Sequence, residues 1–562
     1  MRSTSPRLYW GAHQPRGTTM ARQLRSLSSS SALCAALLCA SACGAPEAAL
    51  LEDDQNFTSA VATLLQFEFD GELTTTLNAN LRTQVKAQLF YAVGQLNATY
   101  SVARLDGLQL PTLTSATVGG GLYKVRYHAR LPVAWGSKTN LPTAYALQLP
   151  RRVDTAGLQA FFSHYGATCT EVDGHELTAG NIWFYFRPAQ AGCTLDAADT
   201  LTAQASASQH PSNTPAKYPE YHRVWEDRTL RVLAVFGKYE KSGQTESDAG
   251  IAAFDSFVAA AQARLPGATV SPAFTGAAGV LHPDVTLSQQ LPGGRSVAIS
   301  ALLVDEVKTA PVSFDKRYAE LTAGADLIVY NGHAGLGSNI AALQTKGAFF
   351  PGKYQIVFLD GCDTFAYLDN ALAARRAALN PDDVAGTKYL DVVTNAMPAY
   401  FNNMPASTMA LVNALLDDGN PRTYPAIFKD ISADHVVVAT GEEDNVFTPG
   451  LRAAAWPTAN TPGEAGFVGK SESVLYTSDV LPAGKYVFEL LPDAAFPGGD
   501  ADLRVRAGVA PDLTQTYKCK SYVGNSNERC VLSLAAPAKV FMSVTGDATG
   551  VQSHFELRAF VQ

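Results

Sequence analysis

Short apolar runs that alternate with helix-type segments constrain the fold of this chain most strongly. Three such runs are residues 230–236 (LRVLAVF), 327–330 (LIVY) and 354–359 (YQIVFL). Each has the length of a strand, and the segments between them carry apolar residues at helical spacing. Because strands that are buried on both faces have no polar side, this order predicts a mainly parallel sheet covered by helices on both faces. We place this α/β/α sandwich at residues 228–447.

The region before this sheet is predicted to be a smaller α+β domain at residues 44–200. Residues 123–131 (YKVRYHARL) alternate strictly between apolar and polar side chains, which is typical of a half-buried strand. Residues 182–186 are predicted to form a further strand, and residues 57–69 and 158–165 to form helices. No motif in this region indicates a function.

A linker is predicted at residues 201–227, because residues 202–220 are rich in Ala, Ser, Pro and Thr. Such a segment is where a protease cuts most easily. The sequence leaves open whether the N-terminal region is a pro-segment that is removed there.

After about residue 463 the pattern changes to short strands separated by Gly, Pro and Asp turns. A strand spacing of about ten residues is typical of an all-β sandwich, which we place at residues 463–562. Three domains agree with the length of 562 residues, because single cores stop growing at about 250–300 residues.

The first 43 residues have the pattern of a signal peptide. Residues 20–25 (MARQLR) are basic, residues 31–42 are apolar, and the segment is too short to span a bilayer. Met20 fits as the start, because the residues before it match neither a signal nor a fold. The segment ends in Ala-Ser-Ala-Cys43, which resembles a bacterial lipobox with Ala40 in place of the usual leucine; the alternative is cleavage near Ala42. We therefore expect export to a bacterial cell envelope, with a lipid anchor on Cys43, or secretion.

Composition excludes several classes of protein. The net charge is −8 and no basic block stands out, so nucleic acid is not expected as a partner. The chain has no G-x-S-x-G motif of a serine hydrolase and no glycine pattern of a nucleotide site. We expect no cofactor.

Export makes the eight cysteines informative. Two of them, Cys34 and Cys39, would leave with the signal, and Cys43 is the lipidation candidate. The pairs Cys169/Cys193 and Cys519/Cys530 are each close in sequence and are predicted to form local disulfides. Cys362 is then left without a partner. It is either a small buried hydrophobe or a reactive thiolate.

His333 and Cys362 both follow predicted strands directly, in short turns that contain glycine. Sequential strands are usually neighbours, and the crevice of an open parallel sheet lies at the carboxyl ends of its strands. A thiol beside a histidine can act as a nucleophile, and the backbone amides of Ala334 and Cys362 are suited to bind an oxyanion. The small residues Gly332 and Gly361 would let a substrate backbone come close. A metal site is not expected, because no second Cys or His lies within the spacing of zinc ligands.

The motifs LIVYNGHAG, with His333, and IVFLDGCDTF, with Cys362, resemble those of the caspase-like (clan CD) cysteine peptidases. That group includes legumain, clostripain, gingipain and separase. The resemblance covers residues 228–447 and implies an α/β/α sandwich with His333 as general acid/base and Cys362 as nucleophile. It also implies catalysis without a third carboxylate, so Asp326, Asp360 and Asp363 receive no role. The family usually has glycine after the histidine, whereas this chain has Ala334, so the geometry of that turn is less free.

A second resemblance concerns residues 465–562. The stretch GDADLRVR at 499–506, followed by a loop between Cys519 and Cys530, is similar to the bacterial pre-peptidase C-terminal domain, with Arg504 in place of the usual tyrosine. Such domains are appended to secreted peptidases, so the resemblance favours a hydrolase. Two hypotheses follow: an exported cysteine endopeptidase that acts on peptides or proteins, or an inactive cell-surface binding protein on the same scaffold. The sequence does not indicate the preferred residue at the scissile bond or the oligomeric state.

Overall fold

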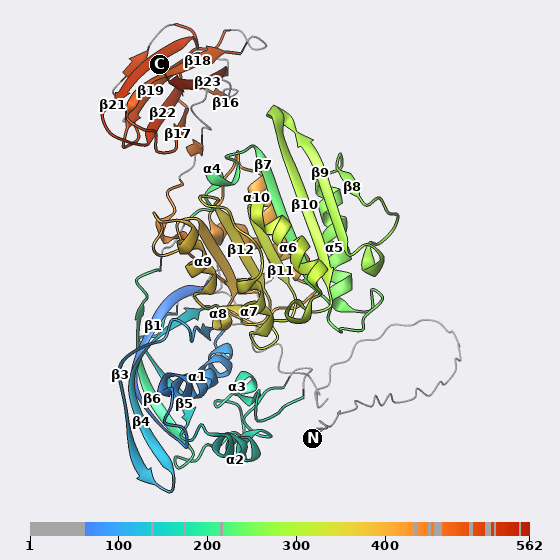
Figure 1. Ribbon diagram of the computed structural model, residues 1–562, viewed down its shortest axis with the longest axis vertical. Helices are drawn as coiled ribbons and strands as arrows, with labels where there is room; N and C mark the ends of the chain where they lie inside the picture. The colour runs from blue at the N-terminus through green and yellow to red at the C-terminus, as the bar shows by residue number, and fades with distance from the viewer. Residues whose placement is uncertain are drawn as a thin grey trace, which may run out of the picture. The chain divides into compact units, whose positions relative to one another are not determined.

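The fold is described by a computed structural model for residues 62–136, 140–172, 176–213, 217–431, 435–447, 451–453, 464–493, 498–511, 519–521, 524–549 and 552–561 (Figure 1). The predicted signal segment 1–43, with Cys34, Cys39 and Cys43, lies outside these residues. Within the described part of the chain, no helix is long and apolar enough to cross a membrane.

The central region contains an eight-stranded sheet in the order β14-β13-β12-β11-β7-β10-β9-β8. Five neighbouring strands run parallel, namely β10 (Arg295–Val304), β7 (Thr229–Gly237), β11 (Leu327–Asn331), β12 (Gln355–Asp360) and β13 (Leu390–Asn395). The antiparallel strands stand at the two edges and are β14 (Val437–Thr440), β9 (Asp284–Leu291) and β8 (Thr269–Ser271). The predicted mainly parallel sheet is therefore confirmed.

Helices cover both faces of this sheet. One face carries α5 (Ala249–Arg264), α10 (Met404–Leu416) and the short α11 (Tyr424–Ile427), and the other carries α6 (Val312–Gly324), α7 (Ser338–Thr345) and α9 (Ala371–Leu379). Successive residues of β7 alternate between two cores, with Phe236 in the first and Val235 in the second. Since both faces are buried, every residue of β11 and β12 is buried, which explains the nearly continuous apolar runs of the sequence.

The N-terminal region is an antiparallel sheet in the order β2-β4-β1-β6-β5, with β3 paired to β4. Its strands are β1 (Thr63–Thr75), β2 (Val102–Ala103), β3 (Gln109–Gly119), β4 (Leu122–Trp135), β5 (Ala144–Pro150) and β6 (Thr200–Gln209). Three helices accompany them, α1 (Leu81–Asn97), α2 (Thr155–Tyr165) and α3 (Ile182–Tyr185). The predicted α+β region, its strand at 123–131 and its helix at 158–165 are confirmed.

Three local predictions in this region are wrong. The helix expected at 57–69 is instead strand β1 from Thr63 onward, where Leu65, Phe67 and Phe69 are buried on one face. The strand expected at 182–186 is the one-turn helix α3. The start of the predicted linker is strand β6, in which the small buried residues Ala203 and Ala205 alternate with exposed polar ones. Residues 214–216 of the predicted linker lie outside the described residues. Composition alone could not separate a strand of Ala, Ser and Thr from a linker.

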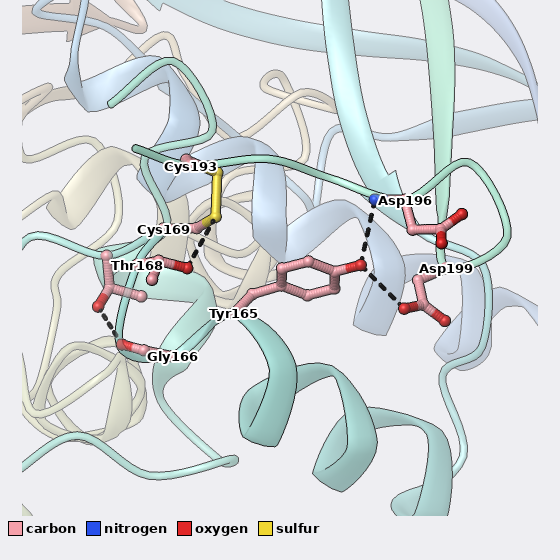
Figure 2. The surroundings of a disulfide bond; sticks show 8 residues. Tyr165, Gly166, Thr168, Cys169, Cys193, Asp196 and Asp199 are labelled. Atoms are coloured by element: carbon pink, nitrogen blue, oxygen red, sulfur yellow. Dashed lines mark hydrogen bonds between the residues drawn. A yellow bond between two sulfur atoms is a disulfide. The ribbon is translucent and has the colours of Figure 1, made fainter. Parts of the chain in front are cut away.

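The predicted Cys169–Cys193 disulfide is present, beyond the end of α2 (Figure 2). Close to it, the Tyr165 hydroxyl donates to Asp199 Oδ2 at 2.8 Å and accepts from the Asp196 amide at 3.2 Å. These contacts and the disulfide tie α2 to the segment that leads into β6. Cys530 is also disulfide-bonded, while the side chain of Cys519 lies outside the described residues. Cys362 is a free cysteine.

The N-terminal region joins the central sheet through backbone and side-chain contacts. The Ala62 amide donates to the Val437 carbonyl of edge strand β14 at 2.6 Å. One apolar cluster combines residues of both regions, among them Leu64 and Val102 from the first and Phe365 and Val438 from the second.

The C-terminal region consists of two β-sheets around one core, as predicted for a sandwich. One sheet has the order β15-β17-β22-β19-β20 and the other has the order β16-β23-β18-β21. Tyr476 and Leu503 of the first sheet and Phe488 and Phe555 of the second share that core. The strands are β15 (Leu451–Ala453), β16 (Glu464–Val468), β17 (Ser473–Thr477), β18 (Gly484–Pro492), β19 (Ala501–Ala507), β20 (Cys519–Ser521), β21 (Glu528–Leu534), β22 (Val540–Gly546) and β23 (Ser553–Val561).

Candidate active site

His333 and Cys362 leave the sheet side by side. Strands β11 and β12 are parallel neighbours, and Asn331 stands opposite Asp360 at their carboxyl ends. Each candidate residue follows two positions later, and the Gly332 amide donates to the Asp360 carbonyl at 3.1 Å. The expectation that these two strands are neighbours is confirmed, and the sheet register places both turns at the same edge.

The glycine before the cysteine allows the two turns to touch each other. A Cβ atom at Gly361 would lie 2.6 Å from the Gly332 carbonyl oxygen and 3.4 Å from the Ala334 nitrogen. Gly361 therefore allows the two turns to come close to each other. The sequence suggested a substrate backbone as the group that comes close.

His333 is oriented by a carbonyl from a third strand end. Its Nε2 lies 3.1 Å from the carbonyl oxygen of Tyr239, two residues beyond β7. A carbonyl can only accept, so Nε2 donates, and in the neutral ring the lone pair is on Nδ1. The imidazole also packs against the rings of Tyr239 and Phe401, each with its centroid 5.0 Å away, and these two rings contact each other with centroids 5.6 Å apart.

Asp248 fixes the turn that presents this carbonyl. It caps α5, where its Oδ1 accepts from the amides of Gly250 and Ile251, and the same carboxylate accepts from the amides of Tyr239 at 3.0 Å and Glu240 at 2.7 Å. Sequence reasoning missed Tyr239, Phe401 and Asp248. An aspartate before an apolar helical segment is a recognisable N-cap signal, but its second role on the turn after β7 has no local signature.

Cys362 is a half-buried thiol in its resting state. Its Sγ donates a long hydrogen bond of 3.7 Å to the Ala399 carbonyl. Burial raises its pKa to about 12, and the neighbouring charges of Asp363 and Asp360 act in the same direction. The side chain is therefore protonated at neutral pH, and a base must remove its proton for it to act as a nucleophile.

The Ala334 and Cys362 amides are the donors that the sequence predicts for an oxyanion. Neither N–H donates to a carbonyl or side-chain oxygen among the described residues. Ala334 has no positive φ, whereas the next residue, Gly335, has a φ of 60°. The position that needs the left-handed conformation is therefore occupied by glycine, and alanine is accommodated without backbone strain.

The buried carboxylates of Asp360 and Asp363 lie on either side of Cys362 in the sequence, and their contacts are structural. Asp360 Oδ1 accepts from Asn395 Nδ2 at 2.7 Å and lies 3.3 Å from His435 Nε2, and burial raises the pKa of this carboxyl. Asn395 Nδ2 also donates to the Gly361 carbonyl at 3.0 Å. This polar group thus supports the cysteine turn from below. The amide of Asn97 in α1 donates to the second carboxylate, Asp363, at 2.8 Å.

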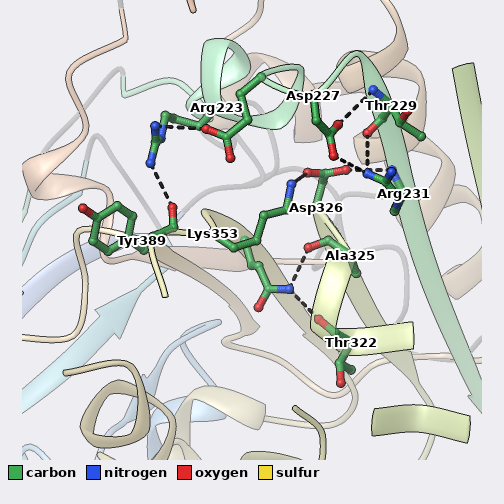
Figure 3. A network of polar contacts seen from close by, with 12 residues as sticks. Arg223, Asp227, Thr229, Arg231, Thr322, Ala325, Asp326, Lys353 and Tyr389 are labelled. Carbon is green, nitrogen blue, oxygen red and sulfur yellow. Dashed lines mark hydrogen bonds and ion pairs between the residues drawn. The ribbon is translucent and has the colours of Figure 1, made fainter. Parts of the chain in front are cut away.

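Asp326 lies at the opposite end of the strands. It precedes β11 and pairs with Lys353, in a network with Arg231 and Asp227 (Figure 3). Burial raises the pKa of Asp326 to about 7, with Lys353 acting in the other direction. This network belongs to the amino ends of the strands, away from His333 and Cys362. Among the described residues, no group of three or more His, Cys, Asp or Glu side chains is placed to hold a metal ion.

No known protein family matches this sequence, and no curated protein matches it. Among the solved structures that match, three are each similar to about a fifth of the chain. The pre-peptidase C-terminal domain of a collagenase from Bacillus anthracis is 16% identical, covers 19% of this chain and 91% of its own, and has a TM-score of 0.15. The periplasmic g-type lysozyme inhibitor PliG of Aeromonas hydrophila is 17% identical over 20% of this chain and 97% of its own, with a TM-score of 0.16. The surface-associated copper-binding protein CorA of Methylomicrobium album BG8 is 5% identical over 20% of this chain and 98% of its own, with a TM-score of 0.15. Likenesses at this level carry no argument about activity.

Proposed function

We propose that this protein is an exported cysteine endopeptidase of the caspase-like group. The observation that carries the proposal is the position of His333 and Cys362 just beyond the carboxyl ends of neighbouring parallel strands, with their two turns in contact. The hydrogen bond from His333 Nε2 to the Tyr239 carbonyl supports it further, because this bond orients the imidazole and, in the neutral ring, places the proton on Nε2.

In the proposed reaction Cys362 Sγ attacks the scissile carbonyl carbon, and its proton moves to Nδ1 of His333. The Ala334 and Cys362 amides donate to the oxygen that becomes negative. His333 then gives the proton to the leaving amine as the C–N bond breaks, which yields an acyl-enzyme. Water attacks the acyl carbon, His333 takes a proton from the water and returns it to the thiol, and the carboxylic acid is released.

Export is part of the proposal. The Cys169–Cys193 disulfide favours an oxidising compartment, since cytosolic proteins rarely keep such bonds. Lipid attachment through Cys43 or free secretion is a further proposal that rests on the sequence of the signal segment alone.

The second candidate is an inactive binding protein on the same scaffold. The raised pKa of Cys362 favours it, because a thiol with a pKa of about 12 that receives no help from a base is ionised to roughly one part in 10⁵ at pH 7. The two candidates therefore differ in whether His333 acts on Cys362.

The deciding experiment compares the mature wild type with Cys362→Ala and His333→Gln. Alkylation of Cys362 by iodoacetamide at pH 7 is followed by peptide mass spectrometry, and cleavage of a mixed peptide library is assayed beside it. We expect His333→Gln to slow the alkylation at least tenfold and both substitutions to abolish cleavage. Equal alkylation of wild type and His333→Gln, with no cleavage by the wild type, would leave the binding protein as the better account.

A further inference from the structure

The residue after the candidate nucleophile has an unusual conformation. Asp363 has a φ of 50°, in the left-handed region that non-glycine residues rarely adopt, and its side chain is fully buried. It precedes the short helix α8 (Thr364–Tyr367), and its amide donates to the Met397 carbonyl at 3.1 Å. Such a conformation persists only where the surroundings hold it in place.

Part of that support comes from the N-terminal region. Asn97, the last residue of α1, donates from Nδ2 to Asp363 Oδ1 at 2.8 Å and to the Ser101 carbonyl at 3.1 Å. Further contacts follow along the same segment. Arg104 Nε donates to the Leu368 carbonyl at 3.1 Å, and the Trp183 ring meets Tyr367 with a centroid distance of 6.4 Å.

The side chains of Asn97 and Asp363 could also pair through a second hydrogen bond. Asn97 Oδ1 and Asp363 Oδ2 are both buried, and neither has a hydrogen-bond partner among the described residues. A proton on Asp363 Oδ2 would supply the donor that Asn97 Oδ1 lacks, so that a neutral carboxyl and an amide could pair through two hydrogen bonds. Burial raises the pKa of Asp363 to about 7, against the opposing effects of Asn97 and Arg187, which makes the protonated form accessible at neutral pH.

We propose that the N-terminal region is a permanent part of the site and that Asn97 is a positioning residue, which holds the Cys362 turn through Asp363. The contacts described for His333 and Cys362 themselves come from Tyr239, Phe401 and Ala399, which all belong to the central region. The N-terminal region thus supports the cysteine turn from the side of Asp363. A removable pro-segment, which the sequence left open, would not be expected to provide a buried hydrogen bond to the residue beside the nucleophile. The catalytic meaning of this positioning rests on the proposed peptidase function.

The test uses the full mature chain in four forms: wild type, Asn97→Leu, Gln95→Leu and Asp363→Asn. Gln95 is the matched control, because it lies on the same helix, is buried, and makes two hydrogen bonds within the N-terminal sheet, to the Ala146 carbonyl and from the Gln148 amide. Asp363→Asn is the conservative variant, since its amide can keep both bonds to Asn97. The rate of alkylation of Cys362 by iodoacetamide at pH 7 is measured in each form, and kcat and KM are measured wherever cleavage is detected.

We expect Asn97→Leu to slow the alkylation about tenfold or more relative to Gln95→Leu, because the turn that carries the thiol is no longer held at Asp363. Its kcat should fall with KM little changed, because Asn97 is buried and acts through Asp363. Asp363→Asn should stay within a few-fold of the wild type. The proposal is overturned if Asn97→Leu reacts no more slowly than Gln95→Leu, or if Asp363→Asn is as slow as Asn97→Leu. If the alkylation pattern holds while the wild type cleaves nothing, the peptidase function fails and the positioning role stands.

Discussion

Gly250→Ala tests the packing behind His333, because its two effects on stability have opposite signs. Helix propensity favours alanine, whereas the close contacts of this position disfavour it. Gly250 lies in the first turn of α5, where alanine would favour the helix by about 1 kcal/mol. In the structure, however, a Cβ at this position would lie 2.3 Å from the Gly237 carbonyl oxygen, 2.7 Å from Lys238 Cα and 2.8 Å from the Tyr239 nitrogen. All three are backbone atoms, so the helix or the turn after β7 must move. Overpacking of this kind costs about 1–3 kcal/mol, and after subtraction of the helix gain we expect a net loss of up to about 2 kcal/mol.

Urea unfolding followed by far-UV circular dichroism measures this change. The control is Gly324→Ala at the end of α6, where the nearest atom to a new Cβ is Arg231 Cδ at an ordinary 3.7 Å. This variant should unfold at the wild-type midpoint or slightly above it. Gly250→Ala should unfold earlier and, because the Tyr239 carbonyl moves with the turn, should also alkylate more slowly at Cys362. If Gly250→Ala raises the midpoint as much as Gly324→Ala does, the close contact between α5 and the turn after β7 is refuted.

Two further predictions concern stability. Burial raises the pKa of Asp391 to about 7 from an ordinary value of 3.8, although hydrogen bonds from Tyr354, Tyr424 and Asn445 act in the other direction. The stabilising contribution of this carboxyl is therefore complete below about pH 4 and is lost as the pH rises through 7. The free energy of unfolding of the wild type relative to Asp391→Asn should therefore fall between pH 4 and pH 8, by up to about 4 kcal/mol, and a difference that does not vary with pH would contradict this. Replacing Cys169 and Cys193 by serine opens a loop with a sequence separation of 24 and should destabilise the N-terminal region by about 3 kcal/mol, seen as a lower unfolding midpoint; an unchanged midpoint would show that α2 is held by Tyr165 and its partners alone.

The central fold could be predicted from the sequence because burial on both faces leaves a direct mark on the residues. The runs at 230–236, 327–330 and 354–359 are apolar apart from Arg231 and Gln355, and each lies almost entirely in a largely buried strand. The N-terminal region was harder to predict. In β1 the buried residues Leu65, Phe67, Phe69 and Leu73 lie on one face, although the sequence of this segment also suits a helix, and β6 is rich in small residues that also suit a linker. Side-chain composition does not separate these alternatives; pairing with neighbouring strands does.

For the candidate site, chain order and strand position were enough to predict that His333 and Cys362 follow neighbouring strands. The contacts that hold the two residues depend on the tertiary structure. The Tyr239 carbonyl that binds His333 is 94 residues away, and Asn97, which binds Asp363, is 266 residues away. Neither contact follows from a local propensity, because every residue has a backbone carbonyl and an asparagine at a helix end has many possible roles. The tertiary structure also assigned Gly361 to the contact between the two turns, a role that depends on the register of β11 against β12 and on the packing of both turns.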